Sequence, residues 1–125
     1  MLRLAQQRHT TIFTPHMINE LTPTQWAAIA KLKEIGPSSQ NLLGRLTAMD
    51  GATIKGVIDR LTRRGFTSTK QDPADGRRLL VALTGRGEGV YERAKSIAKH
   101  ITGKTLAPLG ASERVELLML LSKVT

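Results

Sequence analysis

Hydrophobic residues recur along this chain three and four positions apart, the spacing of one face of an α-helix, and two short stretches are instead extended in character. The pattern predicts six helices. They begin near Leu2, Thr22, Ser38 or Ser39, Asp50, Thr84 and Ser112. Between the fourth and fifth helices, residues 66–71 and 78–83 are expected to pair as a hairpin. The predicted fold is therefore mainly α, with one small β-hairpin.

Specific residues mark several helix ends. Thr22-Pro23-Thr24-Gln25 is a capping-box sequence with proline at the first helical position, and Gly36-Pro37 ends that helix. The first helix is expected to end near Pro15 because proline lacks the N–H that a helix interior needs. Gly65 is the expected end of the fourth helix.

The fourth and last predicted helices differ in their apolar surfaces. The fourth has a narrow stripe, formed by Ile54, Val57, Ile58 and Leu61, and its other face is polar and basic. In the last helix, apolar residues between Val115 and Val124 cover too much of the circumference for a single buried face. We expect this helix to pack against a second copy of the chain.

The charge of the chain indicates its class of partner. Its 125 residues include 19 Lys and Arg but only 10 Asp and Glu, a net charge of +9. Residues 45–87 hold nine of the basic and four of the acidic residues, which is +5 of the total. This balance favours a polyanionic partner such as nucleic acid. Aromatic residues are too scarce to form a platform for single-stranded bases.

Other functional classes lack their sequence signals. There is no cysteine, which rules out a disulfide framework, a thiol nucleophile and a cysteine zinc site. No apolar run approaches the roughly 20 residues that span a membrane, and no signal-peptide core is present, so one cytoplasmic domain over 1–125 is expected. No nucleophile elbow, phosphate-binding loop or carboxylate pair indicates an enzyme, and no cofactor is predicted.

Residues 21–84 have the element order of a winged helix-turn-helix: a helix, a short helix, a turn, a basic helix and a hairpin with a basic tip. A helix about 10–12 Å across fits the major groove of duplex DNA, which is about 12 Å wide. Arginines at a hairpin tip can enter the narrower minor groove, where the potential is most negative. The expected fold is therefore a winged helix-turn-helix flanked by N- and C-terminal helices.

The stretch from Leu21 to Thr84 resembles the MarR family of bacterial transcription regulators. Asp75-Gly76-Arg77, followed by an aliphatic strand ending in Leu83-Thr84, is close to the family's wing pattern, and Asp72-Pro73 precedes it. Leu21–Trp26 and Gly36–Leu42 look like the family's second helix and the turn into its third. The resemblance implies a homodimeric regulator, usually a repressor, that binds a pseudo-palindromic DNA operator.

The resemblance also implies separate roles for the flanking segments and the DNA-binding lobe. The flanking segments 1–19 and 86–125 would form the dimer, and a small aromatic or phenolic anion would bind between them and the DNA-binding lobe. Departures from the family pattern occur on the fourth helix and on the wing. Gly56 replaces an arginine that often contacts DNA, while Lys55 brings a charge one position earlier, so the operator cannot be inferred from relatives. Arg78 stands where the family prefers a small residue, which predicts an additional phosphate contact.

DNA contacts are expected from three segments. They are Ser38, Ser39, Gln40 and Thr47 around the third helix; Ala52, Thr53, Lys55, Gly56, Arg60 and Arg64 on the fourth; and Arg77 and Arg78 on the wing. Arg77 is the strongest candidate. Asp75 is expected to orient it, because phosphate repels a carboxylate. For Thr53 and Lys55 an ordinary solvated helix face is the alternative, and helix capping explains the serines equally well.

Candidate effector residues lie near the N-terminus. Arg8, His9, Phe13, His16 and Trp26 offer a cation, hydrogen-bond donors and ring surface for an aromatic anion. The alternative is that Phe13 and Trp26 belong to the core and that the histidines are interfacial. His9 and His16 do not complete a metal-ligand set, so no metal site is predicted.

Two other functions compete with a ligand-responsive regulator. The first is an architectural or non-specific DNA-binding module without an effector. The second is an RNA-binding winged helix. Preference for one duplex over random duplex, and for DNA over structured RNA, distinguishes these functions.

Overall fold

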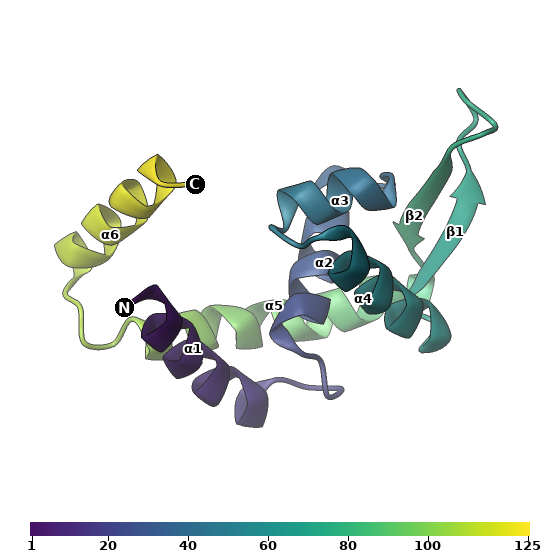
Figure 1. The fold of residues 1–125 in the computed structure, drawn as a ribbon. Coiled ribbons are helices and arrows are strands. Elements are labelled where there is room, and N and C mark those ends of the chain that lie inside the picture. The colour runs from purple at the N-terminus through teal and green to yellow at the C-terminus, as the bar shows by residue number, and fades with distance from the viewer.

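The computed structural model describes residues 1–125 and confirms a mainly helical fold with one two-stranded antiparallel hairpin (Figure 1). The elements are α1 (Leu2–His16), α2 (Pro23–Ile35), α3 (Gln40–Leu46), α4 (Gly51–Arg63), β1 (Thr67–Gln71), β2 (Leu79–Leu83), α5 (Gly85–Thr105) and α6 (Ala111–Lys123). None of the helices combines the length and the apolar content that crossing a membrane requires.

Most helix starts are fixed by the side chains that the sequence indicates. The capping box of α2 forms as predicted, with the Thr22 hydroxyl accepting from the Gln25 N–H and the Gln25 side chain accepting from the Thr22 N–H. Ser39, Asp50 and Thr84 likewise accept backbone N–H bonds at the starts of α3, α4 and α5. Gly65 follows the last residues of α4 with φ +80°, a conformation that glycine adopts without strain.

The predicted end of the first helix near Pro15 is confirmed, whereas the predicted start of the last helix at Ser112 is wrong. Helix α1 continues through Pro15 to His16, because in the last turn the missing proline N–H removes a single bond and the Met17 N–H still reaches the Phe13 carbonyl. Helix α6 begins after Gly110, not at Ser112. The Glu113 carboxylate accepts the Gly110 N–H at 2.8 Å, so the N-cap is Gly110, two residues before Ser112.

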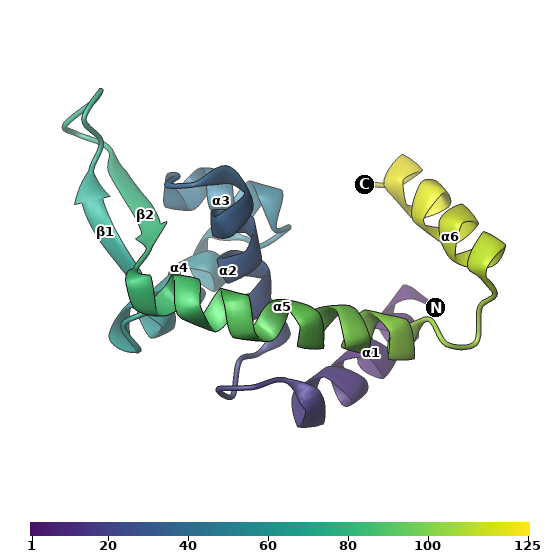
Figure 2. The ribbon, with the colours of Figure 1, turned by 180° about the vertical axis from the view of Figure 1, so that it is seen from behind.

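The core joins the helix-turn-helix to α5. All four apolar residues of the α4 stripe are buried, together with Phe66, Val90 and Ala94. Residues Ser38 and Val81 exchange two backbone hydrogen bonds, which fix the base of the hairpin to the turn between α2 and α3. Figure 2 shows α5 running from this lobe to α1, which packs against the far end of α5.

Helix α6 stands apart from the rest of the chain at the end of the loop that follows α5 (Figures 1 and 2). None of its residues is buried. Its exposed apolar residues include Val115, which is 70% exposed, and Leu118, which is 61% exposed. The apolar surface of α6 is therefore uncovered in the single chain.

Candidate nucleic-acid interface

The polar face of α4 is open to solvent. Ala52, Thr53, Lys55 and Arg60 are exposed on the side opposite the buried stripe. Lys55 Nζ lies 3.1 Å from Asp59 Oδ2, an exposed pair of the kind that contributes little stability. A methyl group at Gly56 would approach only the Arg60 guanidinium, at 3.6 Å, so packing does not require glycine here.

The first turn of α4 is anchored by Asp50. Its Oδ1 accepts the Thr53 N–H at 2.7 Å. Hydrogen bonds from the backbone and side chain of Thr53 hold the pKa of the Asp50 carboxyl below its usual value, against an opposing effect of desolvation. The cap therefore keeps the start of α4 ordered beside the exposed Thr53.

At the wing tip, the turn orients one arginine and leaves its side chain exposed to solvent. Asp75 Oδ1 accepts the Arg77 N–H at 3.1 Å and lies 3.7 Å from Arg77 Nε. The Arg77 side chain is nevertheless 96% exposed. The turn itself is closed by the Asp72 N–H donating to the Arg78 carbonyl and the Arg78 N–H donating to the Asp75 carbonyl. The carboxylate thus supports the root of Arg77 while the guanidinium projects into solvent.

Arg78 connects the wing to α3. Its Nη2 donates to Ser39 Oγ at 3.3 Å, across 39 residues of sequence. Ser39 also accepts the Leu42 N–H as the cap of α3. Gln40 is half-buried beside it. Arg78 therefore holds the wing close to the start of α3, a contact that the sequence did not indicate.

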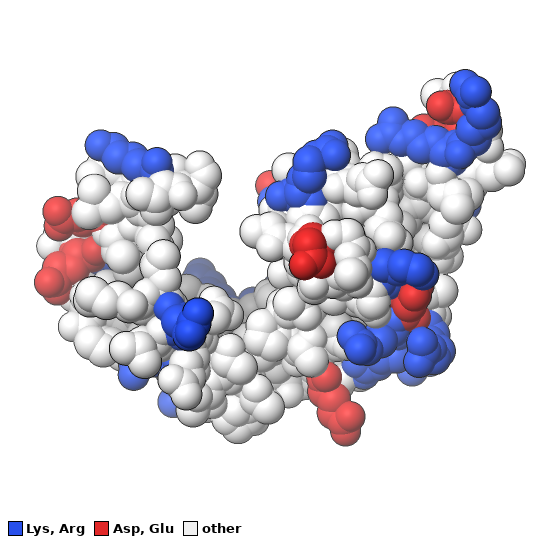
Figure 3. Space-filling view, viewed as in Figure 1, with Lys and Arg blue, Asp and Glu red and all other residues white.

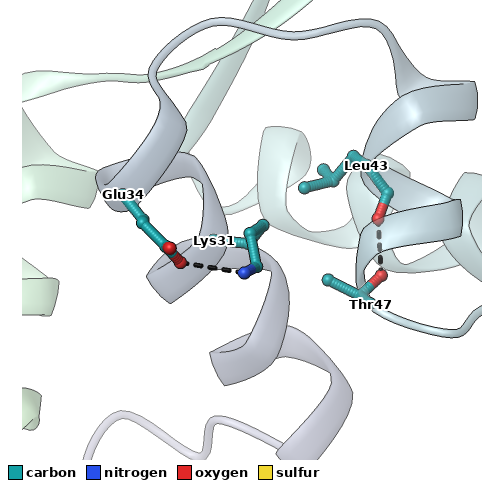
Figure 4. Close-up of polar contacts among 4 residues, drawn as sticks. All are labelled: Lys31, Glu34, Leu43 and Thr47. Carbon is teal, nitrogen blue, oxygen red and sulfur yellow. Dashed lines mark hydrogen bonds and ion pairs between the residues drawn. The ribbon is translucent and has the colours of Figure 1, made fainter. Parts of the chain in front are cut away.

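Three predicted contact residues are engaged inside the lobe. Ser38 is only 5% exposed, and its side chain does not reach the surface. The Thr47 hydroxyl donates to the Leu43 carbonyl of its own helix at 2.7 Å; Figure 4 shows this bond beside the exposed Lys31–Glu34 pair. The Arg64 guanidinium donates to the Asn19 carbonyl and lies 4.8 Å from the centre of the Phe66 ring. Thr47 and Arg64 therefore make contacts within the lobe, and the hydroxyl of Ser38 is buried without a hydrogen-bond partner.

A hollow of about 590 Å³ separates α4 from the hairpin. Its lining includes Gln40, Asp59, Thr62, Arg63, Thr69 and Leu79. Sequence reasoning missed Thr69 and Leu79, because only the β1–β2 register and the Ser38–Val81 bridge bring the hairpin face opposite α4. No local pattern signals this juxtaposition.

The charges visible on this side of the molecule are mostly basic. Figure 3 shows lysines and arginines at the tip of the hairpin and over the lobe that contains α3 and α4. The side of α6 turned toward the lobe is uncharged in the same view. Helix α5 thus joins a mostly basic lobe to α6, which has charged residues only on its other sides in this view.

The predicted effector residues do not line a common cavity in the single chain. Arg8 donates to the carbonyls of Lys104 and Thr105 at the end of α5, and His9 Nδ1 lies 2.9 Å from Thr105 Oγ1. Phe13 is buried, as the core alternative predicts. His16 packs near His100, with ring centres 6.0 Å apart.

The fifth of these residues, Trp26, stacks on Tyr91 of α5. The ring centres are 5.6 Å apart and the planes differ by 7°. The Lys33 ammonium group lies over the Tyr91 ring, with Nζ 5.8 Å from the ring centre. A hydrogen bond from Lys33 to Glu88 raises the pKa of the Lys33 ammonium group. Trp26 thus joins α2 to α5, away from Arg8 and His9.

Comparison with known proteins gives consistent matches. A model of the MarR family matches residues 21–79. The HTH-type transcriptional repressor NicR of Pseudomonas putida is 38% identical over 99% of this chain and 79% of NicR. A probable transcriptional regulator from Pseudomonas aeruginosa has a TM-score of 0.95 at 49% identity, covering 99% of this chain and 93% of the other.

A third match concerns a regulator with a known ligand. The structure of Bordetella bronchiseptica BpsR, whose DNA binding is regulated by 6-hydroxynicotinic acid, has a TM-score of 0.90 at 38% identity. The match covers 98% of this chain and 94% of BpsR.

Proposed function

This chain belongs to the MarR family of transcription regulators, and we propose that it is a homodimeric, ligand-responsive repressor that binds a pseudo-palindromic site in duplex DNA. It is a transcription regulator and not an enzyme. The observation that carries the proposal is the exposed Arg77 guanidinium on a hairpin fixed beside the exposed polar face of α4.

Each part of the lobe has its own role on DNA. Helix α4 enters the major groove, where the exposed Thr53 and Lys55 reach base edges or phosphates and Ala52, Gly56 and Arg60 complete the contact face. Arg77, oriented by Asp75, enters the adjacent minor groove. Ser39, Gln40 and Arg78 contact the phosphate backbone beside α3.

The uncovered apolar surface of α6 supports the homodimer. A second copy of the chain would bury Val115 and Leu118 against the flanking helices α1, α5 and α6. A twofold dimer presents two copies of α4 to successive major grooves, about 34–36 Å apart. This arrangement accounts for a pseudo-palindromic operator.

The similarity to BpsR supports a small aromatic acid as the effector. The ligand would bind between the dimer helices and the lobe, near the α1–α5 contact. Arg8 already donates to two carbonyls of α5, so a bound carboxylate would have to compete for that guanidinium or use another donor. The effector acts only if it binds more tightly to the dimer at one separation of the two α4 helices than at another.

Binding to a duplex selected by the protein from a random library tests the proposal. Fluorescence anisotropy should show a preference over random duplex on the order of 10³-fold or more at physiological salt. Arg77→Ala should weaken binding to all sequences and reduce the slope of log affinity against log salt by about 0.9, while Arg93→Ala on α5 changes neither.

Three results would contradict parts of the proposal. Equal affinity for selected and random duplex would favour the architectural module. A monomer in sedimentation experiments would contradict the dimer. If neither 6-hydroxynicotinic acid nor related aromatic acids lowered DNA affinity, the ligand response would be refuted.

A further inference from the structure

The hollow between α4 and the hairpin has the composition of a surface for a chain that is part anionic and part apolar. Arg63 is exposed and has no carboxylate within 4.0 Å. Thr69 is exposed on the hairpin side, and Leu79 is 58% exposed at the start of β2. A cation, a hydroxyl and an apolar side chain therefore line one depression of about 590 Å³.

The position of the hollow identifies its occupant once the proposed function is accepted. In duplex DNA, a sugar–phosphate strand separates each major groove from the adjacent minor groove. If α4 occupies the major groove and the wing tip occupies the minor groove, the strand between those grooves must pass between α4 and the hairpin. The hollow lies at that place.

We infer that the hollow binds this sugar–phosphate strand and that Arg63 is its phosphate-binding residue. Thr69 donates to the same strand from the opposite wall, and Leu79 packs against deoxyribose. The inference rests on the proposed binding of α4 and the wing in adjacent grooves. It assigns a backbone contact to Arg63 that fixes the position of the lobe without reading the bases.

The one acidic group of the lining does not oppose this assignment. Asp59 Oδ2 is paired with Lys55 Nζ at 3.1 Å, so a cation accompanies the carboxylate beside the strand. Arg78 directly precedes β2, and its hydrogen bond to Ser39 keeps the wing near α3 and so maintains the width of the hollow.

Arg63→Gln, compared with Arg93→Gln, tests the assignment with the whole 125-residue chain and the selected duplex. Both variants remove one exposed, unpaired arginine, but Arg93 lies on α5 outside the lobe's polar face. Arg63→Gln should weaken binding about tenfold on every sequence, the effect of losing one charge-assisted hydrogen bond. It should also reduce the salt slope by about 0.9. Thr69→Val should weaken binding severalfold without changing the salt slope.

A methylphosphonate scan locates the contact. Neutralising the phosphate between the bases contacted by α4 and those contacted by the wing should weaken wild-type binding about as much as Arg63→Gln does. It should not weaken Arg63→Gln further, whereas methylphosphonates elsewhere should act equally on both proteins. Thermal unfolding of each variant confirms that it is folded.

The outcomes separate this inference from the proposed function. If the wild type prefers its selected duplex and depends on Arg77, but Arg63→Gln behaves like Arg93→Gln, only the strand assignment is overturned. It is also overturned if every methylphosphonate acts independently of Arg63. If the wild type selects no duplex, both the proposed function and the strand assignment fail.

Discussion

Replacing Gly87 with alanine tests how tightly the hairpin is fixed to α5. Gly87 is the third residue of α5, and its N–H donates to the Thr84 hydroxyl. A methyl group there would lie 2.1 Å from the Phe66 carbonyl oxygen and 3.2 Å from Leu83 Cδ2. The same carbonyl accepts the Thr84 N–H at 3.1 Å. The hairpin base and α5 would therefore have to separate by about 1 Å to restore ordinary contacts.

The change in the free energy of unfolding for Gly87→Ala is the sum of opposing effects. Overpacking of a close contact costs about 1–3 kcal/mol, and weakening the Thr84 hydrogen bond adds about 1 kcal/mol. The better helix propensity of alanine offsets about 0.5–1 kcal/mol of this loss. The net expectation for Gly87→Ala is a loss of about 1–3.5 kcal/mol in the free energy of unfolding. For a domain of this size, that corresponds to a fall in Tm of about 4–14 °C.

Gly89→Ala is the matched control in the same helix. A methyl group at Gly89 meets only the flexible end of Arg93, at 3.4 Å, so this variant should gain stability from helix propensity. Thermal and urea unfolding at equal protein concentration measure both variants. Below its Tm, Gly87→Ala should also bind the selected duplex more weakly because its hairpin is displaced. Equal stability of the two alanine variants would refute the close contact and the reasoning built on it.

Three further predictions concern α4 and the dimer. Lys55→Ala should change the preference among operator variants, whereas a uniform loss on all sequences would make Lys55 a backbone contact. The lowered pKa of Asp50 means that its cap stabilises the fold fully above about pH 3.9, its unfolded value, and that this stabilisation is lost as pH falls through the folded pKa. The Tm advantage of wild type over Asp50→Ala should therefore shrink below that pH, and an advantage constant from pH 7 to pH 3 would contradict the assignment. Leu118→Glu should produce monomers in sedimentation and weaken DNA binding, and a dimer of unchanged affinity would exclude α6 from the interface.

Local signals predicted the elements of this fold well because its helix ends depend on nearby side chains. Thr22 and Gln25 satisfy each other's backbone groups within four residues, and the α4 stripe repeats within one helix. The error at the start of α6 arose because a neighbouring group replaced the expected cap. Glu113 satisfies the Gly110 N–H, so α6 starts before Ser112.

The functional surface was less predictable, because much of it depends on contacts between distant segments. Arg77 and Asp75 are two residues apart, so the turn chemistry alone placed them together. Arg78 meets Ser39 only because the Ser38–Val81 bridge brings the hairpin to the start of α3. That bridge also buries Ser38, which the sequence alone presented as a surface residue.

In the proposed dimer, the placement of α5 provides a route by which a ligand bound at one end of the chain would affect DNA binding at the other. At its N-terminus, Thr84 and Gly87 hold the base of the hairpin. At its C-terminus, Arg8 and His9 of α1 contact Thr105. A continuous helix of 21 residues is about 30 Å long and resists bending within its hydrogen-bonded length. A ligand that shifts the α1–α5 contact would therefore reorient the whole lobe, with its internal contacts retained, and so change the separation of the two copies of α4.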